Sequence, residues 1–113
     1  MIETTVISYL SSALETPVSG QTPPGPPASY CTVEKRGSDE NNRLKAALIA
    51  VLSTAPSLAA AAALNERVKH AMAGLPEGAA NVFSCRCTTD YNNTDTRTKE
   101  PRYAAIFRVV YAD

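Results

Sequence analysis

The C-terminal third of the chain contains two runs in which apolar and polar residues alternate, and this feature limits the fold more than any other. The runs are Val82–Tyr91 and Arg102–Tyr111. Alternation with a period of two is typical of β-strands, because successive side chains of a strand point to opposite faces of the sheet. The polar, threonine-rich stretch between the runs is too long for a tight turn. We therefore predict a β-hairpin with a long loop over residues 92–101.

The two faces of this predicted hairpin differ in composition. One face is mainly apolar, and alternation assigns to it Phe83, Cys85, Cys87 and Tyr91 from the first strand and Tyr103, Ala105, Phe107, Val109 and Tyr111 from the second. The other face of the second strand carries Arg102 and Arg108, but also Ile106 and Val110. This second face is too apolar for a surface that only meets water. We expect a helix or another protein chain to cover it.

Two segments have the apolar spacing of amphipathic helices. The first is 2–14, which ends before Pro17, and its apolar stripe is formed by Ile2, Val6, Leu10 and Leu14. The second is 57–74, with Ser57 as the predicted N-cap and Gly74, followed by Pro76, as its end. Its stripe is formed by Leu58, Ala61, Leu64, Val68, Met72 and Leu75.

The segments between these helices are harder to assign. Residues 18–28 hold four prolines and two glycines in "VSGQTPPGPPA", which favours a rigid connector over a polyproline ligand. Tyr30–Lys35 is strand-like, with Cys31 and Val33 on one face, and the polar "RGSDENNR" after it predicts a turn.

Leu44–Ser53 is ambiguous by pattern. Its alanines and leucines favour a helix by propensity. The same segment reads equally well as a strand buried on both faces, with Leu44, Leu48 and Leu52 on one side and Ile49 and Val51 on the other. The residues alone leave both alternatives open.

Size and charge exclude several classes of function. The 113 residues suit one compact domain, 1–113. Lysine and arginine number 11, as do aspartate and glutamate, and this balance argues against a general nucleic-acid binder. No apolar run approaches the ~20 residues of a membrane span, and Glu3 stands where a signal peptide would be basic. Because the three cysteines also fit a reducing compartment, we expect a protein made in the cytoplasm, with no membrane partner and no specific nucleic-acid partner.

Residues that could carry chemistry do not fall into a recognised spacing. Cys85-x-Cys87 lacks the second ligand pair of a zinc site, and core positions are the simpler interpretation. The single histidine, His70, has Glu66 one turn earlier, which favours a helix-surface pair over a general base. The acidic residues are interpreted as solvated turn residues, namely Asp39, Glu40, Asp90, Asp95 and Glu100. We therefore expect no enzyme activity, no cofactor and no metal.

Three stretches carry a resemblance that spans the whole chain. They are "TPVSGQTPPGPPASYCTVEKRGS", "AAALNERVKHAMAGL" and "DYNNTDTRTKEPRYAAIFRVVY". In these motifs the chain resembles small tail-completion, or tail-terminator, proteins of siphophages and their prophages. The resemblance implies an α/β (α+β) fold with a small, mostly antiparallel sheet of about four strands and two helices packed on it. It also implies that residues 44–53 form a strand, although this chain has alanine and leucine there where the family has more aromatic and polar residues.

The function implied by the resemblance is structural. Such proteins form a hexameric ring in the virion that caps the tail tube, ends tail polymerisation and offers an interface for head-tail joining. The implied partners are further copies of the chain, the tail tube protein and a head-completion or connector protein, and the implied location is the tail-head junction. The alternatives are a head-completion or neck adaptor protein, or a small cytosolic binding module that uses the proline-rich stretch.

A ring of identical subunits needs two different contact surfaces on each copy. We expect one surface on the second face of the C-terminal strand and another on the alanine-rich face of the helix at 57–74. The hairpin loop is expected to be mobile in the free subunit and to become ordered against the tube or a neighbour. The candidate assembly residues are Asn92, Asn93, Asp95, Arg97, Lys99, Glu100, Arg102, Ile106, Arg108 and Val110.

Overall fold

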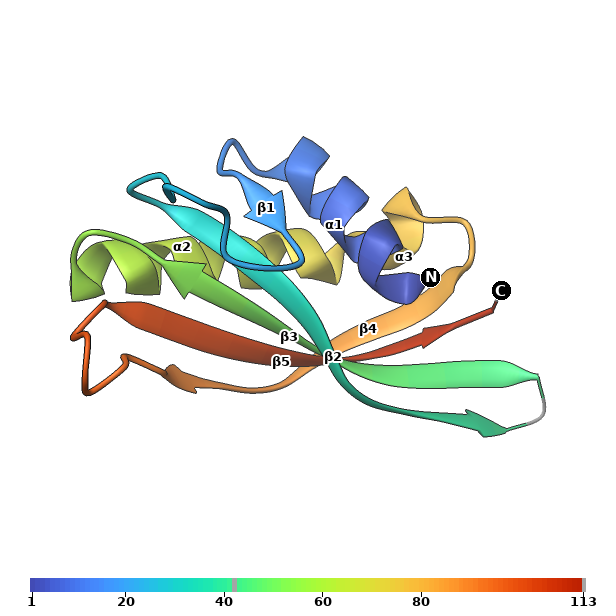
Figure 1. Cartoon of the computed structure of the whole chain (residues 1–113). Coiled ribbons are helices and arrows are strands. Elements are labelled where there is room, and N and C mark those ends of the chain that lie inside the picture. The colour runs from blue at the N-terminus through green and yellow to red at the C-terminus, as the bar shows by residue number, and fades with distance from the viewer. Residues whose placement is uncertain (42, 113) are drawn as a thin grey trace.

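The computed structural model describes residues 1–41 and 43–112, which form one sheet with helices on one side of it (Figure 1). In chain order the elements are α1 (Ile2–Ala13), β1 (Val18–Ser19), β2 (Tyr30–Asn41), β3 (Leu44–Thr54), α2 (Leu58–Ala73), α3 (Leu75–Gly78), β4 (Val82–Asn92) and β5 (Arg102–Tyr111). The strand order is β1-β2-β3-β5-β4, and every neighbouring pair is antiparallel except β1 with β2. The predicted α+β class with a mostly antiparallel sheet is confirmed. The structure has one strand and one helix more than predicted, and these are the short elements β1 and α3.

The core lies between the helices and the face of the sheet that they cover, which we call the helix face. α1 packs on β1 and β2, while α2 packs on β3, β5 and β4. The predicted stripe of α1 is buried, as is that of α2 except for Leu58, which is 45% exposed in the first turn of its helix. At the centre Phe107 of β5 is 1% exposed, and it belongs to the same buried cluster as Leu10 and Leu64. Burial of these stripes is the main force that holds both helices on the sheet.

The ambiguous segment at 44–53 is a strand, as the resemblance implied. β3 lies in the middle of the sheet, between β2 and β5, so its backbone groups are paired on both sides. Its Ile49 and Val51 are fully buried under the helices. Two complete ladders outweigh the helix propensity of its alanines and leucines, since propensity is only a weak local preference.

The predicted polar turn after Lys35 is wrong. β2 continues to Asn41, and its pairing with β3 shifts by a bulge between Lys35 and Gly37. Polar residues suit this stretch because it is mostly exposed at the side of the sheet, where the hydrogen bonds to β3 hold it. β2 ends at Asn41 and β3 begins at Leu44, so the reversal of the chain is much shorter than predicted. Arg43, within this reversal, has a positive φ of 69°.

The predicted face of β4 is also wrong, because two irregularities interrupt the alternation. The pairing of β4 with β5 shifts between Val82 and Ser84 and again between Cys87 and Thr89. Cys85 and Cys87 therefore pair with helix-face residues of β5, whereas Tyr91 pairs with Ala104 on the opposite face. Cys87 is exposed rather than in the core, since β4 is an outer strand. A single inserted residue reverses the side on which all later residues of a strand lie.

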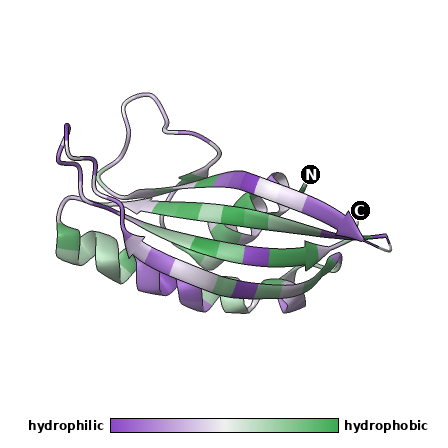
Figure 2. Ribbon diagram, turned by 90° about the horizontal axis from the view of Figure 1, so that it is seen from below, coloured by the Kyte–Doolittle hydropathy of each residue, from purple (hydrophilic) through white to green (hydrophobic). Residues whose placement is uncertain are grey.

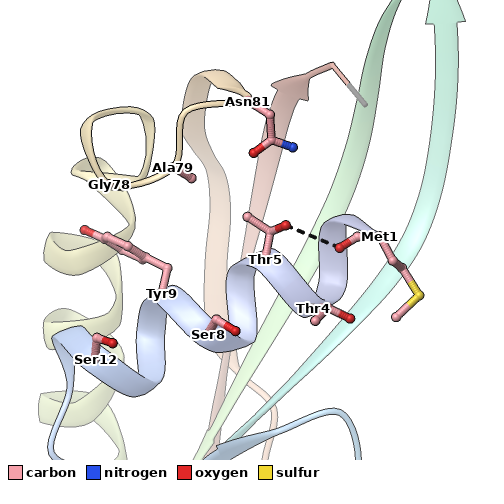
Figure 3. A pocket seen from close by; sticks show the side chains of 9 residues that line it. All are labelled: Met1, Thr4, Thr5, Ser8, Tyr9, Ser12, Gly78, Ala79 and Asn81. Atoms are coloured by element: carbon pink, nitrogen blue, oxygen red, sulfur yellow. Dashed lines mark hydrogen bonds between the residues drawn. The ribbon is translucent and has the colours of Figure 1, made fainter.

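Tyr9 of α1 joins the helices to one another (Figure 3). Its hydroxyl donates a hydrogen bond of 2.7 Å to the carbonyl of Ala71 in α2. The ring lies against Gly74 and Gly78, and a methyl group at Gly78 would collide with it. These glycines therefore leave the space that the ring fills between α1 and α3. No helix of the described residues is long and apolar enough to cross a membrane.

Candidate assembly surface

The face of the sheet opposite the helices, here called the open face, is the most unusual surface of the molecule. None of the described helices lies over it (Figure 1), and Figure 2 shows it from below with apolar residues along the central strands. The register assigns to it Leu44, Leu48 and Leu52 of β3 and Ile106, Arg108 and Val110 of β5. Leu44 and Leu48 are 45% and 40% exposed. An apolar strand face with no covering layer is typical of a contact surface.

Two arginines lie next to each other on the open face. Arg86 of β4 is directly opposite Arg108 of β5, and both are exposed. Like charges in directly opposed positions destabilise a strand pair. Within residues 1–41 and 43–112, neither guanidinium has a carboxylate within ion-pair distance. The pair therefore presents unneutralised positive charge beside Leu48 and Val110.

A polar contact crosses the other half of the open face. Arg36 lies at the bulge of β2 and forms an ion pair of 2.6 Å with Glu34. The hydrogen bond to Glu34 raises the pKa of Arg36 above its usual value, and the nearby Tyr91 raises this pKa further. Because Tyr91 comes from β4 at the other side of the sheet, this contact passes above the two middle strands. Ala50 and Ala104 below it have no exposed surface, although no helix covers them.

The two bulges make this contact possible. One bulge releases Arg36 from regular pairing, and the other turns Tyr91 onto the open face. Arg36 and Tyr91 thus cover one half of the open face, which we call the closed half. The other half, around Leu44, Leu48 and Val110, is accessible. A hollow of about 230 Å³ lies in the accessible half, and Gly37, Asp39, Ala46, Leu48 and Arg108 contribute to its lining.

The hairpin loop, 93–101, has hydrogen bonds of its own. The side-chain oxygen of Asn92 accepts from the backbone N–H of Thr94 at 3.0 Å and from its hydroxyl at 2.7 Å. Asp95 accepts from the backbone N–H of Arg97 at 2.8 Å, and Arg102 donates through Nε to the carbonyl of Asn93 at 3.2 Å. Such Asx-type bonds favour a defined loop shape. The predicted mobility of the loop in the free subunit stays a prediction.

The predicted assembly residues thus fall into two groups. Ile106, Arg108 and Val110 lie together on the open face, as predicted. Arg102 is at the other end of β5, bonded to the loop, and the remaining six belong to the end of β4 or to the loop itself. The four positions from Arg102 to Ile106 span roughly 13 Å along a strand, so the two groups occupy different ends of β5.

Four residues of the open face are absent from the predicted assembly residues, namely Arg36, Leu48, Arg86 and Tyr91. The spacing of Leu44, Leu48 and Leu52 did signal a shared face, once the segment was taken as a strand. No local signal reveals the faces of Arg36 and Tyr91, because these depend on bulges that arise from pairing with a neighbouring strand.

Polar residues from two of the three motifs, the one in α2 and the one that begins at Asp90, form a structural network. Asn65 of α2, 2% exposed, donates through Nδ2 to the Asp90 carboxylate of β4 at 2.9 Å. Lys69 binds the same carboxylate at 3.1 Å and Glu66 at 2.7 Å, and these two carboxylates raise the pKa of Lys69. The prediction of Asp90 as a solvated turn residue is therefore wrong, since it fixes α2 to the sheet. Glu66 binds Lys69 rather than the predicted His70.

We expect Asp90→Ala to lower the free energy of unfolding by about 1–3 kcal/mol, because it leaves the buried amide of Asn65 without its acceptor. Urea denaturation followed by circular dichroism measures this change. Glu40→Ala, at an exposed position of β2, is the matched control and should change stability by less than about 0.5 kcal/mol. Equal stability of the two variants would contradict a role for Asp90 in fixing α2.

The three thiols differ in burial, and all of them are poor nucleophiles. Burial raises the pKa of Cys31 to about 11 and that of Cys85 to about 12, and it also raises the pKa of Cys87. Since the thiolate is the reactive form, we expect slow alkylation of all three by iodoacetamide at pH 8. Access of the reagent sets the order Cys87, then Cys85, then Cys31, because these thiols are exposed, half-buried and buried. Mass spectrometry of a time course tests this order, and the urea-unfolded chain, with all three sites equally accessible, is the control. Faster labelling of Cys31 than of Cys87 would contradict it.

The raised pKa of Cys31 also makes the stability of the fold depend on pH. The thiol of Cys31 loses its proton near its ordinary pKa of 9.0 in the unfolded chain and at about 11 in the folded one. Its contribution to stability is therefore fully present below pH 9 and is lost as the pH rises toward 11.

Two shallow hollows lie beside α1. One, of about 720 Å³, is lined mainly by hydroxyl and amide side chains, and Figure 3 shows Thr5, Ser8, Ser12 and Asn81 around it. The other, of about 730 Å³, lies between α1 and α2 and includes Glu66 and His70. The described residues contain no group of three or more histidine, cysteine or acidic side chains that could hold a metal ion. The predicted absence of enzyme activity and of cofactors stays a prediction.

Neither a protein-family model nor a curated protein sequence matches the chain.

Proposed function

We propose that this protein is a structural subunit of a phage tail, which caps the tail tube as a ring, ends tail polymerisation and provides the interface for head-tail joining. The observation that carries the proposal is the open face of the sheet, where none of the residues in 1–41 and 43–112 forms a layer over the exposed leucines or an ion pair with the two arginines. A subunit of a closed assembly needs such a surface, and a monomeric domain would gain by making it polar.

The motifs that resemble tail-terminator proteins support the proposal in a second way. Asn65 and Lys69 come from one of the three motifs and Asp90 from another, and both side chains bind the Asp90 carboxylate. Their roles are explained by the packing of α2 on β4. This leaves the open face and the hairpin loop as the surfaces that would meet further copies of the chain, the tail tube protein and the head-completion protein at the tail-head junction.

Deletion of the gene from a phage or prophage that encodes this chain tests the proposal. We expect overlong tails that are not joined to heads, as seen by negative-stain electron microscopy. Expression of the wild-type chain from a plasmid should restore joined tails of normal length. If the deletion strain makes normal tails attached to heads, the proposed function is wrong.

A further inference from the structure

The open face carries opposite charge on its two sides. On the β2 side lie Glu34, Arg36 and Asp39, and their formal charges sum to −1. On the β4–β5 side lie Arg86 and Arg108, with a sum of +2. The exposed leucines of β3 lie between these two sides, and Val110 lies beside Arg108 on β5. The open face therefore has an acidic margin, an apolar centre and a basic margin.

Such a face is complementary to itself. When two copies meet with their open faces, the acidic margin of one can lie over the basic margin of the other while the leucines bury one another. Asp39 is the acid best placed for this, because it is exposed and, within the described chain, has no cation within ion-pair distance. It lines the same hollow as Arg108. Complementary charges of this kind fix the orientation of a contact more than they set its strength.

The size of the face also fits a contact between proteins. Four strands about 4.8 Å apart and roughly ten residues long cover a footprint of about 600 Å². Stable interfaces bury about 800 Å² of accessible surface on each partner, and weaker ones bury less. Since side chains add to the flat footprint, the open face can supply most of a specific interface.

We propose that the open face binds a second copy of this chain, with the Asp39 margin of one copy over the Arg86 and Arg108 pair of the other. Because both copies use the same face, this contact is isologous and joins copies in pairs. It is therefore separate from the two different contacts that close the proposed ring, and it goes beyond the proposed function. Leu48 is at the centre of the contact, and its burial against the second copy is the main source of binding energy.

Sedimentation equilibrium of the purified full chain, from about 10 µM to about 1 mM, tests the proposal. We expect the wild-type chain to self-associate in this range and Leu48→Asp to weaken association by about tenfold or more. Leu58→Asp is the matched control, because Leu58 is equally exposed but lies at the start of α2 on the other side of the molecule. Circular dichroism establishes that each variant is folded. A wild-type chain that is monomeric at about 1 mM overturns the proposal, as does equal association of the two variants.

Charge reversal tests the orientation. One variant combines Arg86→Glu with Arg108→Glu, and the other carries Asp39→Lys. Each should associate at least about tenfold more weakly than the wild-type chain, because both margins then have the same sign. A mixture of the two should associate again, since each restores the charge that the other needs. If the mixture is as weak as either variant alone, the orientation is wrong. These measurements use the purified chain alone. A negative result here would overturn the contact between open faces, whereas normal tails in the deletion strain would overturn the proposed function.

Discussion

Replacement of Asn93–Lys99 by two glycines is expected to leave a folded subunit that no longer caps tails. Residues 93–99 lie outside the buried cluster, and their hydrogen bonds are made within this segment and to Asn92, Glu100 and Arg102 at its two ends. Its removal should therefore cost the fold little, whereas it deletes most of the charged side chains at that end of the sheet. In a complementation assay we expect few or no joined particles, compared with full recovery by the wild-type chain.

Two controls make the loop experiment specific. The urea midpoint of the purified deletion variant should stay close to that of the wild-type chain, which excludes unfolding as the cause. Substitution of Arg97 by alanine, an almost fully exposed residue, separates the role of one charge from that of the whole loop. Joined tails of normal length from the deletion variant would show that the loop has no part in assembly.

Phe107→Ala is expected to cause the largest loss of stability among single substitutions, about 3–5 kcal/mol. Phe107 is almost completely buried between Ile49 and the α2 stripe, so the smaller side chain leaves a cavity as well as lost contacts. A domain of this size has a total stability of about 5–15 kcal/mol. Urea denaturation should show the midpoint moving far toward zero denaturant.

Ile106→Ala is the natural comparison, because it is the neighbouring residue on the same strand and points to the open face. It is only partly buried, so we expect a clearly smaller loss. If the two substitutions cost the same, the core is not on the helix face of the sheet as described.

The sequence predicts the parts of the fold that depend on local spacing. The stripes of α1 and α2 and the two faces of β5 follow directly from the residues, and the structure confirms them. The strand at 44–53 could not be decided in this way. Its helix propensity is overcome by hydrogen bonds to β2 and β5, and these partners are distant in sequence.

The open face could be predicted only in part. Ile106, Arg108 and Val110 are found by alternation alone, and the apolar character of Ile106 and Val110 suggests a covered surface. Arg36 and Tyr91 reach this face through bulges, which local patterns do not reveal. The role of Asp90 was missed for a related reason, since its partners in α2 lie 25 and 21 residues earlier in the chain.

The irregular pairing of β4 has one more consequence, which concerns how sheets grow. β4 is the last strand of the sheet, and no described strand pairs with its outer side. A long, regular outer strand offers its free backbone groups to other chains and can start fibre formation. Two shifts within eleven residues interrupt that row of groups. The molecule is thus built to resist indefinite strand-by-strand stacking, so a concentrated solution should stay clear of amyloid while still permitting an assembly of fixed size.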